Sequence, residues 1–167
     1  MSHRVFYTMR HQVAIFDLDE TLWNGKELYE NTIEILEFLQ TNGAHLYIAS
    51  FHLEAPLVCD ELKITKYFSK ILYGRDITKS AMIQQILSEH KNIDPKDVIF
   101  FDDNIKNIYD VETTTKIDTV HVTDGLNWSH IPIYMVTPME IEFPEFFNDT
   151  LFTIYQKGNP LSNPITQ

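Results

Sequence analysis

The segment His11–Asp17 is rich in Val, Ile and Phe and ends in a carboxylate, and a second carboxylate, Asp19, follows one residue later. An apolar run of this length, ended by polar residues, is typical of a strand buried on both faces of a sheet. Such a strand carries its acids to the carboxyl edge of the sheet, where open α/β proteins keep their ligand crevice. Two like charges so close repel each other unless a cation or a proton relieves them, so the pattern indicates a divalent metal or acid-base chemistry.

Strand-like and helix-like segments alternate through most of the chain. The expected strands after the first are Ala44–Ser50, Lys70–Tyr73, Asp97–Phe101 and Lys116–Val122. The expected helices are Asn31–Gln40, Leu53–Leu62, Thr78–His90 and Ile105–Val111. This alternation predicts the α/β class, with a Rossmann-like, doubly wound parallel sheet in a single domain.

Two of the expected helices carry start signals. Asn31 and Glu34 have the spacing of a capping box, and Asn42-Gly43 is expected to end this helix. Thr78 is predicted to cap the helix that follows it. The apolar residues that we expect to face inward from this helix are Met82, Ile83, Ile86 and Leu87.

The pattern weakens in the last quarter of the chain. Ile131–Val136 is predicted as an edge strand, Met139–Tyr155 as an interrupted helix and Gly158–Gln167 as a loose tail. We therefore expect one domain over residues 1–167, with a core of about 11–123 and a C-terminal extension of about 124–167. The aromatic residues of the extension either pack on the core or form a dimer surface.

Composition narrows the functional classes. The 167 residues include 24 acidic and 13 basic ones, for a net charge of -11, and the basic residues form no groove for a nucleic acid. No apolar stretch is long enough for a membrane span, and residues 1–10 lack the character of a signal or transit peptide. The single Cys59 excludes an internal disulfide. We expect a cytoplasmic protein, or one shared between cytoplasm and nucleus.

Polar groups follow several predicted strands and open one predicted helix, all toward one edge of the sheet. They are Asp17, Asp19, Ser50, Lys79, Asp102 and Asp103. Acids from two strand ends can share one Mg²⁺, which prefers oxygen ligands. A hydroxyl and an ammonium group beside the metal can hold phosphoryl oxygens, and the start of a helix favours the same anion. The chemistry that this combination favours is phosphoryl transfer.

In order and context these residues resemble the four motifs of the haloacid dehalogenase superfamily, over about residues 11–123. Within it the chain is most similar to the magnesium-dependent phosphatases, an acid phosphatase family also described as eukaryotic-type protein tyrosine phosphatases. The sequence motifs that it shares with this family are Asp-Leu-Asp-x-Thr-Leu-Trp at 17–23, Ile-Ala-Ser at 48–50, Ile-Phe-Phe-Asp-Asp at 99–103 and Asn-Ile-x-Asp-Val at 107–111. A departure follows Ser50, where Phe51-His52 replaces the family's usual Arg-Thr.

The resemblance implies a role for each acid at the first strand. Asp17 would be the nucleophile that forms an aspartyl-phosphate. Asp19 would protonate the leaving oxygen and later activate water. Ser50 and Lys79 would bind the phosphoryl oxygens.

The resemblance also implies a magnesium site. Its ligands would be Asp17, the main-chain carbonyl of Asp19 and one of Asp102 and Asp103. Alignment with the superfamily's G-D-x-x-x-D form favours Asp103 as the direct ligand and leaves Asp102 with a supporting hydrogen bond.

About thirty residues separate Asp19 from Ser50, and about thirty more separate Ser50 from Lys79. Because the sheet itself uses these segments, no inserted cap domain fits. A member of the superfamily without a cap, as this chain is expected to be, resembles the members that accept proteins or other large substrates. The named family is also associated with sugar-phosphate substrates. The expected substrates are therefore phosphotyrosine-type phosphoproteins or small sugar phosphates.

Two other functions fit parts of the pattern. The wording Asp-Leu-Asp-Glu-Thr-Leu at 17–22 also resembles the carboxy-terminal-domain phosphatases, which act on phosphoserine in proteins. A non-catalytic phosphate-binding or signalling module on the same fold is the alternative from another class. Response-regulator receivers place the adjacent acid pair before the phosphoacceptor Asp, whereas here the order is reversed. Trp23 and the second acid, Asp103, favour the magnesium-dependent phosphatases, and the role of His52 is left open.

Overall fold

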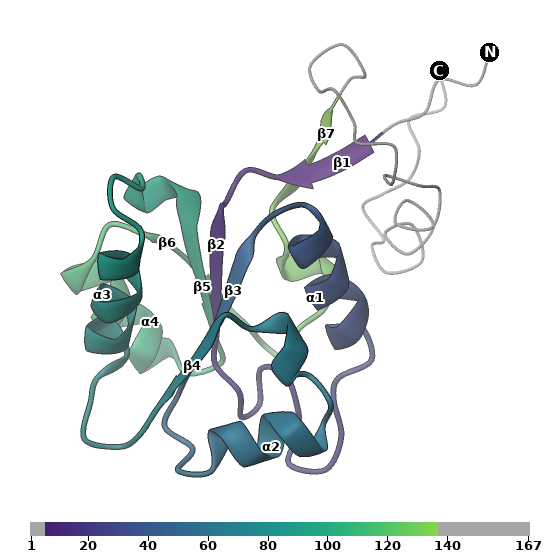
Figure 1. Cartoon of the computed structure of the whole chain (residues 1–167), viewed down its shortest axis with the longest axis vertical. Coiled ribbons are helices and arrows are strands. Elements are labelled where there is room, and N and C mark those ends of the chain that lie inside the picture. Colours follow the sequence, from purple (N-terminus) through teal and green to yellow (C-terminus); the bar gives the residue numbers. More distant parts are fainter. Residues whose placement is uncertain (1–5, 137–167) are drawn as a thin grey trace.

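The computed structural model describes residues 6–136, and its centre is a sheet of five parallel strands (Figure 1). The strand order is β4 (Lys70–Tyr73), β3 (His45–Ser50), β2 (Val13–Phe16), β5 (Val98–Asp102) and β6 (Asp118–His121). This arrangement confirms the predicted α/β class with a doubly wound parallel sheet in one small domain.

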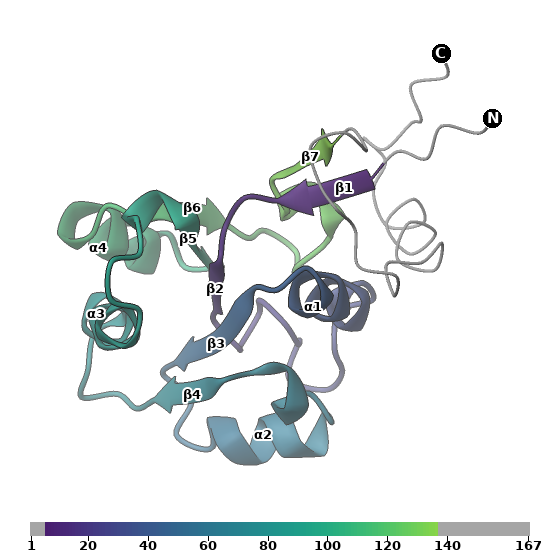
Figure 2. The same cartoon turned by 45° about the horizontal axis from the view of Figure 1, so that its top comes forward.

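Helices cover both faces of the sheet (Figure 2). On one face lie α1 (Thr32–Thr41) and α2 (Ala55–Glu61), and on the other lie α3 (Lys79–Glu89) and α4 (Ile105–Thr114). Three short 3₁₀ turns, η1 (Thr65–Tyr67), η2 (Pro95–Asp97) and η3 (Trp128–His130), join these elements. None of the helices within residues 6–136 is long and apolar enough to cross a membrane.

Strand β2 shows why the sheet is stable between two helical layers. Ala14 and Phe16 pack into the core beneath α1 and α2, while Val13 and Ile15 pack into the core beneath α3 and α4. All four side chains are fully buried. Successive side chains of a strand point to opposite faces, so a continuous apolar run is what a doubly covered strand requires.

The strand order determines where Asp17 lies in the sheet. From β2 the chain builds outward through β3 and β4, then returns to the other side of β2 with β5 and continues to β6. The order therefore reverses at β2, and open α/β sheets hold their ligand crevice beyond the carboxyl ends of the strands at such a point. Asp17 is the residue that follows β2.

The helix caps only partly match the prediction. Thr78 accepts a hydrogen bond from the backbone N–H of Ala81, which confirms it as the cap of α3. The capping box predicted at Asn31 and Glu34 is wrong, because the Asn31 side chain makes no capping hydrogen bond. Asn31 has φ -93° and ψ 2°, whereas a capping side chain normally projects from an extended residue.

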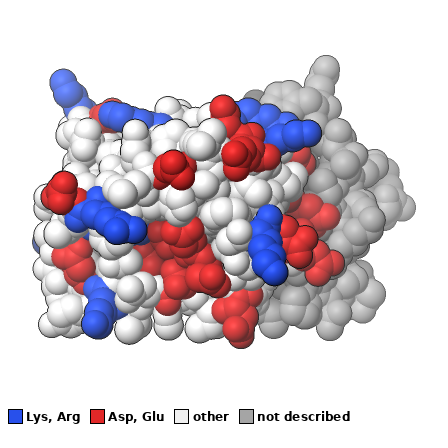
Figure 3. Space-filling view, turned by 90° about the horizontal axis from the view of Figure 1, so that it is seen from below, with Lys and Arg blue, Asp and Glu red and all other residues white. Residues whose placement is uncertain are grey.

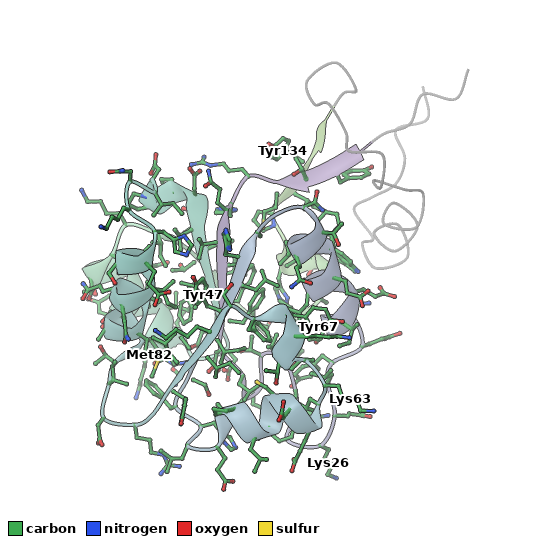
Figure 4. All side chains as sticks on the ribbon, viewed as in Figure 1. Lys26, Tyr47, Lys63, Tyr67, Met82 and Tyr134 are labelled. Atoms are coloured by element: carbon green, nitrogen blue, oxygen red, sulfur yellow. The ribbon has the colours of Figure 1, made fainter. Side chains whose placement is uncertain are left out.

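A separate antiparallel ribbon lies outside the main sheet (Figure 1). It pairs β1 (Phe6–Met9), which was not predicted, with β7 (Ile133–Val136). The strand predicted within Ile131–Val136 is confirmed as β7, but its partner is β1 in this ribbon rather than a strand of the main sheet. The ribbon holds Tyr134 away from the helical layers (Figure 4). The predicted helix Met139–Tyr155 and the tail Gly158–Gln167 lie outside the described residues.

Candidate active site

A tight turn after β2 separates the two carboxylates of the Asp-x-Asp pair. The Leu18 carbonyl accepts the backbone N–H of Leu22 at 3.0 Å, and Glu20 takes the left-handed conformation with φ 59°. Asp17 stays at the sheet edge and is only 7% exposed, whereas Asp19 is exposed. The same turn therefore produces one buried acid and one acid open to solvent.

Strand register brings the other acid pair to Asp17. Phe16 of β2 lies opposite Phe101 of β5, so Asp17 and Asp102 occupy equivalent positions on neighbouring strands. Asp17, Asp102 and Asp103 each offer a carboxylate oxygen, and these three oxygens lie within 4.8 Å of one another. The carboxylate of Asp19 is not part of this cluster among the described residues.

Lys79 is the cation of this cluster and is almost completely buried, at 1% exposed. Because Thr78 caps α3, Lys79 stands in the first turn of that helix and points at the strand ends. Its Nζ donates to Asp17 Oδ1 at 2.7 Å, to Asp102 Oδ2 at 3.0 Å and to the Ala49 carbonyl at 2.7 Å. All three ammonium protons are thus used within the protein.

Burial makes the acids of the cluster harder to ionise. It raises the pKa of Asp17 to about 7, against the attraction of Lys79 and with the repulsion of Asp102. Burial likewise raises the pKa of Asp103 above its ordinary value. One ammonium group is too little charge for three carboxylates, so the cluster favours a further cation.

The two adjacent acids after β5 have different surroundings. Asp102 is fully buried and accepts the backbone N–H of Asn104 at 2.8 Å and the side-chain N–H of Asn107 at 3.0 Å. Asp103 is only partly buried, and the Thr21 hydroxyl lies 3.5 Å from its Oδ1, at the long end of a hydrogen bond. Asp102 is therefore held rigidly, and Asp103 keeps more of its oxygen lone pairs free.

Ser50 and Asp19 lie at the same edge of the sheet but outside the three-acid cluster. Ser50 ends β3 at the same edge of the sheet, and its Oγ accepts the backbone N–H of His52 at 3.0 Å. That contact leaves the Ser50 hydroxyl proton free to donate to a ligand. Asp19 Oδ1 accepts the indole N–H of Trp23 at 2.9 Å, which orients this carboxylate outside the three-acid cluster.

Acidic side chains gather in the middle of the face on which the strands end, with basic side chains around them (Figure 3). A larger hollow of about 680 Å³ lies at the opposite ends of β5 and β6. The acid Asp118 of this hollow is already paired, with His11 at 2.7 Å and with Lys96 at 3.2 Å. The acid cluster, rather than the larger hollow, is therefore the candidate active site.

All six residues expected at the site lie at this edge of the sheet, and the structure adds three contacts that the sequence did not indicate. The Ala49 carbonyl binds Lys79, the Phe51 ring lies 4.8 Å from the Lys79 Nζ, and Trp23 binds Asp19. The only available signal was position, because Ala49 and Phe51 flank Ser50 and Trp23 follows Asp19 closely in the chain.

A parallel sheet of this order, with acids after β2 and β5 and a buried lysine opening α3, defines a phosphatase of the haloacid dehalogenase superfamily. Residues 24–133 match the family model described as Acid Phosphatase. The chain belongs to this family, and it is a phosphoric monoester hydrolase. The matched segment contains Ser50, Lys79, Asp102 and Asp103, while Asp17 and Asp19 precede it.

Solved structures share the fold at low sequence identity. A candidate phosphatase from Clostridium difficile is 19% identical with a TM-score of 0.63, covering 71% of this chain and 88% of that one. A haloacid dehalogenase-like hydrolase from Streptococcus pneumoniae is 16% identical with a TM-score of 0.58, covering 68% and 85%. The phosphatase-containing N-terminal part of a Bacteroides fragilis protein, complexed with Mg, is 17% identical with a TM-score of 0.54, covering 68% and 36%. No curated protein sequence matched the chain.

Proposed function

We propose that this phosphatase is Mg²⁺-dependent and acts through an aspartyl-phosphate on phosphotyrosine-type phosphoproteins or small sugar phosphates. The observation that carries the proposal is the buried Asp17, paired with Lys79 at 2.7 Å and clustered with Asp102 and Asp103 where the sheet order reverses. A nucleophile, a cation and further acids at one point are what phosphoryl transfer needs from a protein.

The donor set fits magnesium. Three carboxylates supply hard oxygen ligands. Burial raises the pKa values of Asp17 and Asp103, and a cation beside them would favour their ionised forms. Asp17 and Asp103 would hold the ion, together with the Asp19 carbonyl. Asp102 would have a supporting role, since its hydrogen bonds to Asn104 and Asn107 fix its carboxylate beside them. When bound, Mg²⁺ neutralises charge on the transferring phosphoryl group.

The first chemical step belongs to Asp17 and Asp19. An Asp17 oxygen attacks phosphorus, so that a bond forms between them while the bond from phosphorus to the leaving oxygen breaks. Asp19 donates its proton to that oxygen, and the alcohol or phenol departs. In the second step Asp19 removes a proton from water, the water oxygen attacks phosphorus, and Asp17 is released with inorganic phosphate.

Ser50 would donate its hydroxyl proton to the non-bridging oxygens during both steps, and Lys79 would bind them by exchanging its contact with Asp17 for a phosphoryl oxygen. Lys79 is held beside Asp17 by its contact with the Ala49 carbonyl, which keeps the ammonium group at the point where negative charge develops. Ser50 is fully buried and keeps its hydroxyl proton for the same oxygens. Trp23 orients Asp19 by occupying Oδ1, so that Oδ2 is left for the transferred proton.

Turnover of an aryl phosphate, measured with Mg²⁺ and with a chelator, tests the proposal. The chelator should stop turnover, and Asp17→Asn should lower kcat by at least about 10³-fold and abolish phosphoenzyme. Asp19→Asn should still bind Mg²⁺ and phosphate, with kcat lowered by about 10²-fold to 10⁴-fold. Metal-independent turnover, or an active Asp17→Asn enzyme, would contradict the mechanism. Values of kcat/KM on phosphotyrosyl peptides, phosphoseryl peptides and sugar phosphates then rank the substrate classes.

A further inference from the structure

A second cavity, of about 450 Å³, opens beside Asp19 on the face that carries the acid cluster. Its wall comes from the loop between β3 and α2 and from the loop between β4 and α3. The lining residues are Asp19, Phe51, His52, Leu53, Glu54 and Arg75. Only Asp19 among them has a role in the chemistry proposed above.

Three contacts join this cavity to the phosphoryl site. Asp19 lines the cavity and is the proton donor for the leaving oxygen. The Phe51 ring lies over Lys79, with 4.8 Å between Nζ and the ring centroid. The backbone N–H of His52 binds Ser50 Oγ at 3.0 Å. A substrate with phosphorus at Asp17 and its leaving oxygen at Asp19 therefore extends its leaving group into this cavity.

The near part of the cavity offers apolar surface and one hydrogen-bond donor. Phe51 is half-buried and Leu53 is 57% exposed, so both present carbon to a ligand. His52 Nδ1 accepts the backbone N–H of Glu54 at 3.1 Å, which leaves Nε2 as the protonated nitrogen of the neutral ring. Within residues 6–136, no hydrogen-bond partner occupies that second ring nitrogen.

The far part of the cavity carries the charge. Arg75 follows Gly74, whose φ is 135°, and its guanidinium group is exposed. No ion pair joins Arg75 to Glu54 or to another acid in the described part of the chain, although Glu54 lines the same cavity. An exposed guanidinium group without an ion-pair partner is a favourable partner for an anion, and basic side chains surround the central acids on this face (Figure 3).

We propose that this cavity is the leaving-group site, and that it selects phosphate monoesters whose leaving group has apolar surface near the ester oxygen and an anionic group farther out. The inference rests on the phosphatase function proposed above. Phe51 and Leu53 contact the apolar part, and Arg75 binds the anion. Glu54 opposes the same anion, so the two charged residues act on selectivity with opposite sign.

Two aryl esters of matched size test this selectivity, namely 4-carboxyphenyl phosphate and 4-carbamoylphenyl phosphate, which differ by one charge. We expect wild-type kcat/KM to favour the carboxylate ester by about tenfold, mainly through KM, as one charge-assisted hydrogen bond allows. Arg75→Gln should lower that ratio to about one, and Glu54→Gln should raise it above the wild-type value. Lys91→Gln removes a positive charge beyond the far end of α3 and should leave the ratio unchanged.

The outcomes separate the inference from the function on which it rests. Turnover of both esters with a ratio that Arg75→Gln does not change overturns the leaving-group site and leaves the phosphatase function intact. If neither ester is turned over, both the leaving-group site and the phosphatase function are overturned. If the variants unfold at the same midpoint as the wild type, a changed ratio does not come from a damaged fold.

Discussion

At the scale of single residues, the candidate active site is a buried cluster in which negative charge exceeds positive charge. Lys79 uses all three protons on Asp17, Asp102 and the Ala49 carbonyl, and it still leaves the acids under-compensated. Removing one member of a buried ion group strands the others without a partner, so such groups are strongly coupled. The same excess of negative charge that opposes folding would favour the binding of a cation.

The pKa of Asp17 predicts a pH dependence of stability in the metal-free protein. Burial raises this pKa to about 7, while the unfolded chain loses the same proton near pH 4. Between these values the folded state binds more protons than the unfolded state, so the contribution of Asp17 to stability falls as pH rises from about 4 to about 7. Denaturant unfolding of wild type and Asp17→Asn in chelator should show a difference that grows across this window. An equal pH slope in the two proteins would contradict the assignment.

At the scale of elements, helix starts and turns decide where the site residues stand. Thr78 caps α3 and so directs Lys79 at the strand ends, while the start of α1 has no side-chain cap. The loop that contains Tyr29 and the loop that contains Gly125 pack closely together, and the Tyr29 ring lies against the backbone of Gly125. Two matched pairs of substitutions test these local arrangements.

The first pair tests the caps. Thr78→Ala should lower the free energy of unfolding by about 1 kcal/mol, because the N–H of Ala81 loses its acceptor. Asn31→Ala should change it by less than about 0.5 kcal/mol, since its side chain makes no capping hydrogen bond. Denaturant titration of both variants measures the difference. A larger loss from Asn31→Ala than from Thr78→Ala would refute this assignment of caps.

The second pair tests the contact between loops. Gly125 and Gly43 both have positive φ, 82° and 88°, so alanine strains the backbone at either position. At Gly43 the new Cβ meets open space, and about 1 kcal/mol of destabilisation is expected. At Gly125 the Cβ would overlap the Tyr29 ring, so the loss should exceed that of Gly43→Ala by about 1 kcal/mol or more. Equal losses would show that the loop relaxes freely.

At the scale of the whole molecule, the sheet holds the acids together even though they repel. Asp17 and Asp103 directly follow two strands that are neighbours in space, although the two residues lie more than eighty positions apart in the sequence. Their repulsion acts against the folded state alone, since the unfolded chain separates them. A cation that binds the cluster should therefore stabilise the entire fold.

Magnesium should raise the free energy of unfolding by about 2.7 kcal/mol at a hundredfold excess over its Kd. Asp103→Asn removes one acid, so without metal it should be at least as stable as wild type at pH 7.5 and should gain much less from Mg²⁺. Glu61→Gln, an exposed acid at the end of α2, is the matched control and should behave as wild type. Equal stabilisation of the wild type and Asp103→Asn by Mg²⁺ would place the ion elsewhere.

Most of the main fold could be predicted because the spacing of apolar residues along the sequence indicates which side chains are buried. All five parallel strands and four helices lie where apolar runs and helical periodicity indicated, and Lys70–Tyr73 has the predicted bounds. Strand β1 could not be found in this way. Its partner β7 is more than one hundred residues away in the sequence, and neither strand carries a signal for that pairing.

The capping box at Asn31 failed for a related reason. The residue types had the right spacing, but capping also needs an extended backbone at Asn31, and its ψ of 2° excludes this. Residue types at a given spacing therefore predict a cap only where the backbone conformation is known. Thr78 has ψ 161° and meets both conditions.

The sequence by itself determined the class of fold and the residue types that gather at the candidate site, since periodicity marks buried strands and the acids stand directly after two of them. The tertiary structure alone decided which groups share space. Lys79 donates to Asp17 and Asp102, and Trp23 donates to Asp19, which lies outside their cluster. Within the described residues, Arg75 has no ion-pair partner at the cavity beside Asp19. These relations depend on strand register and on distances between segments far apart in the chain, which no local pattern encodes.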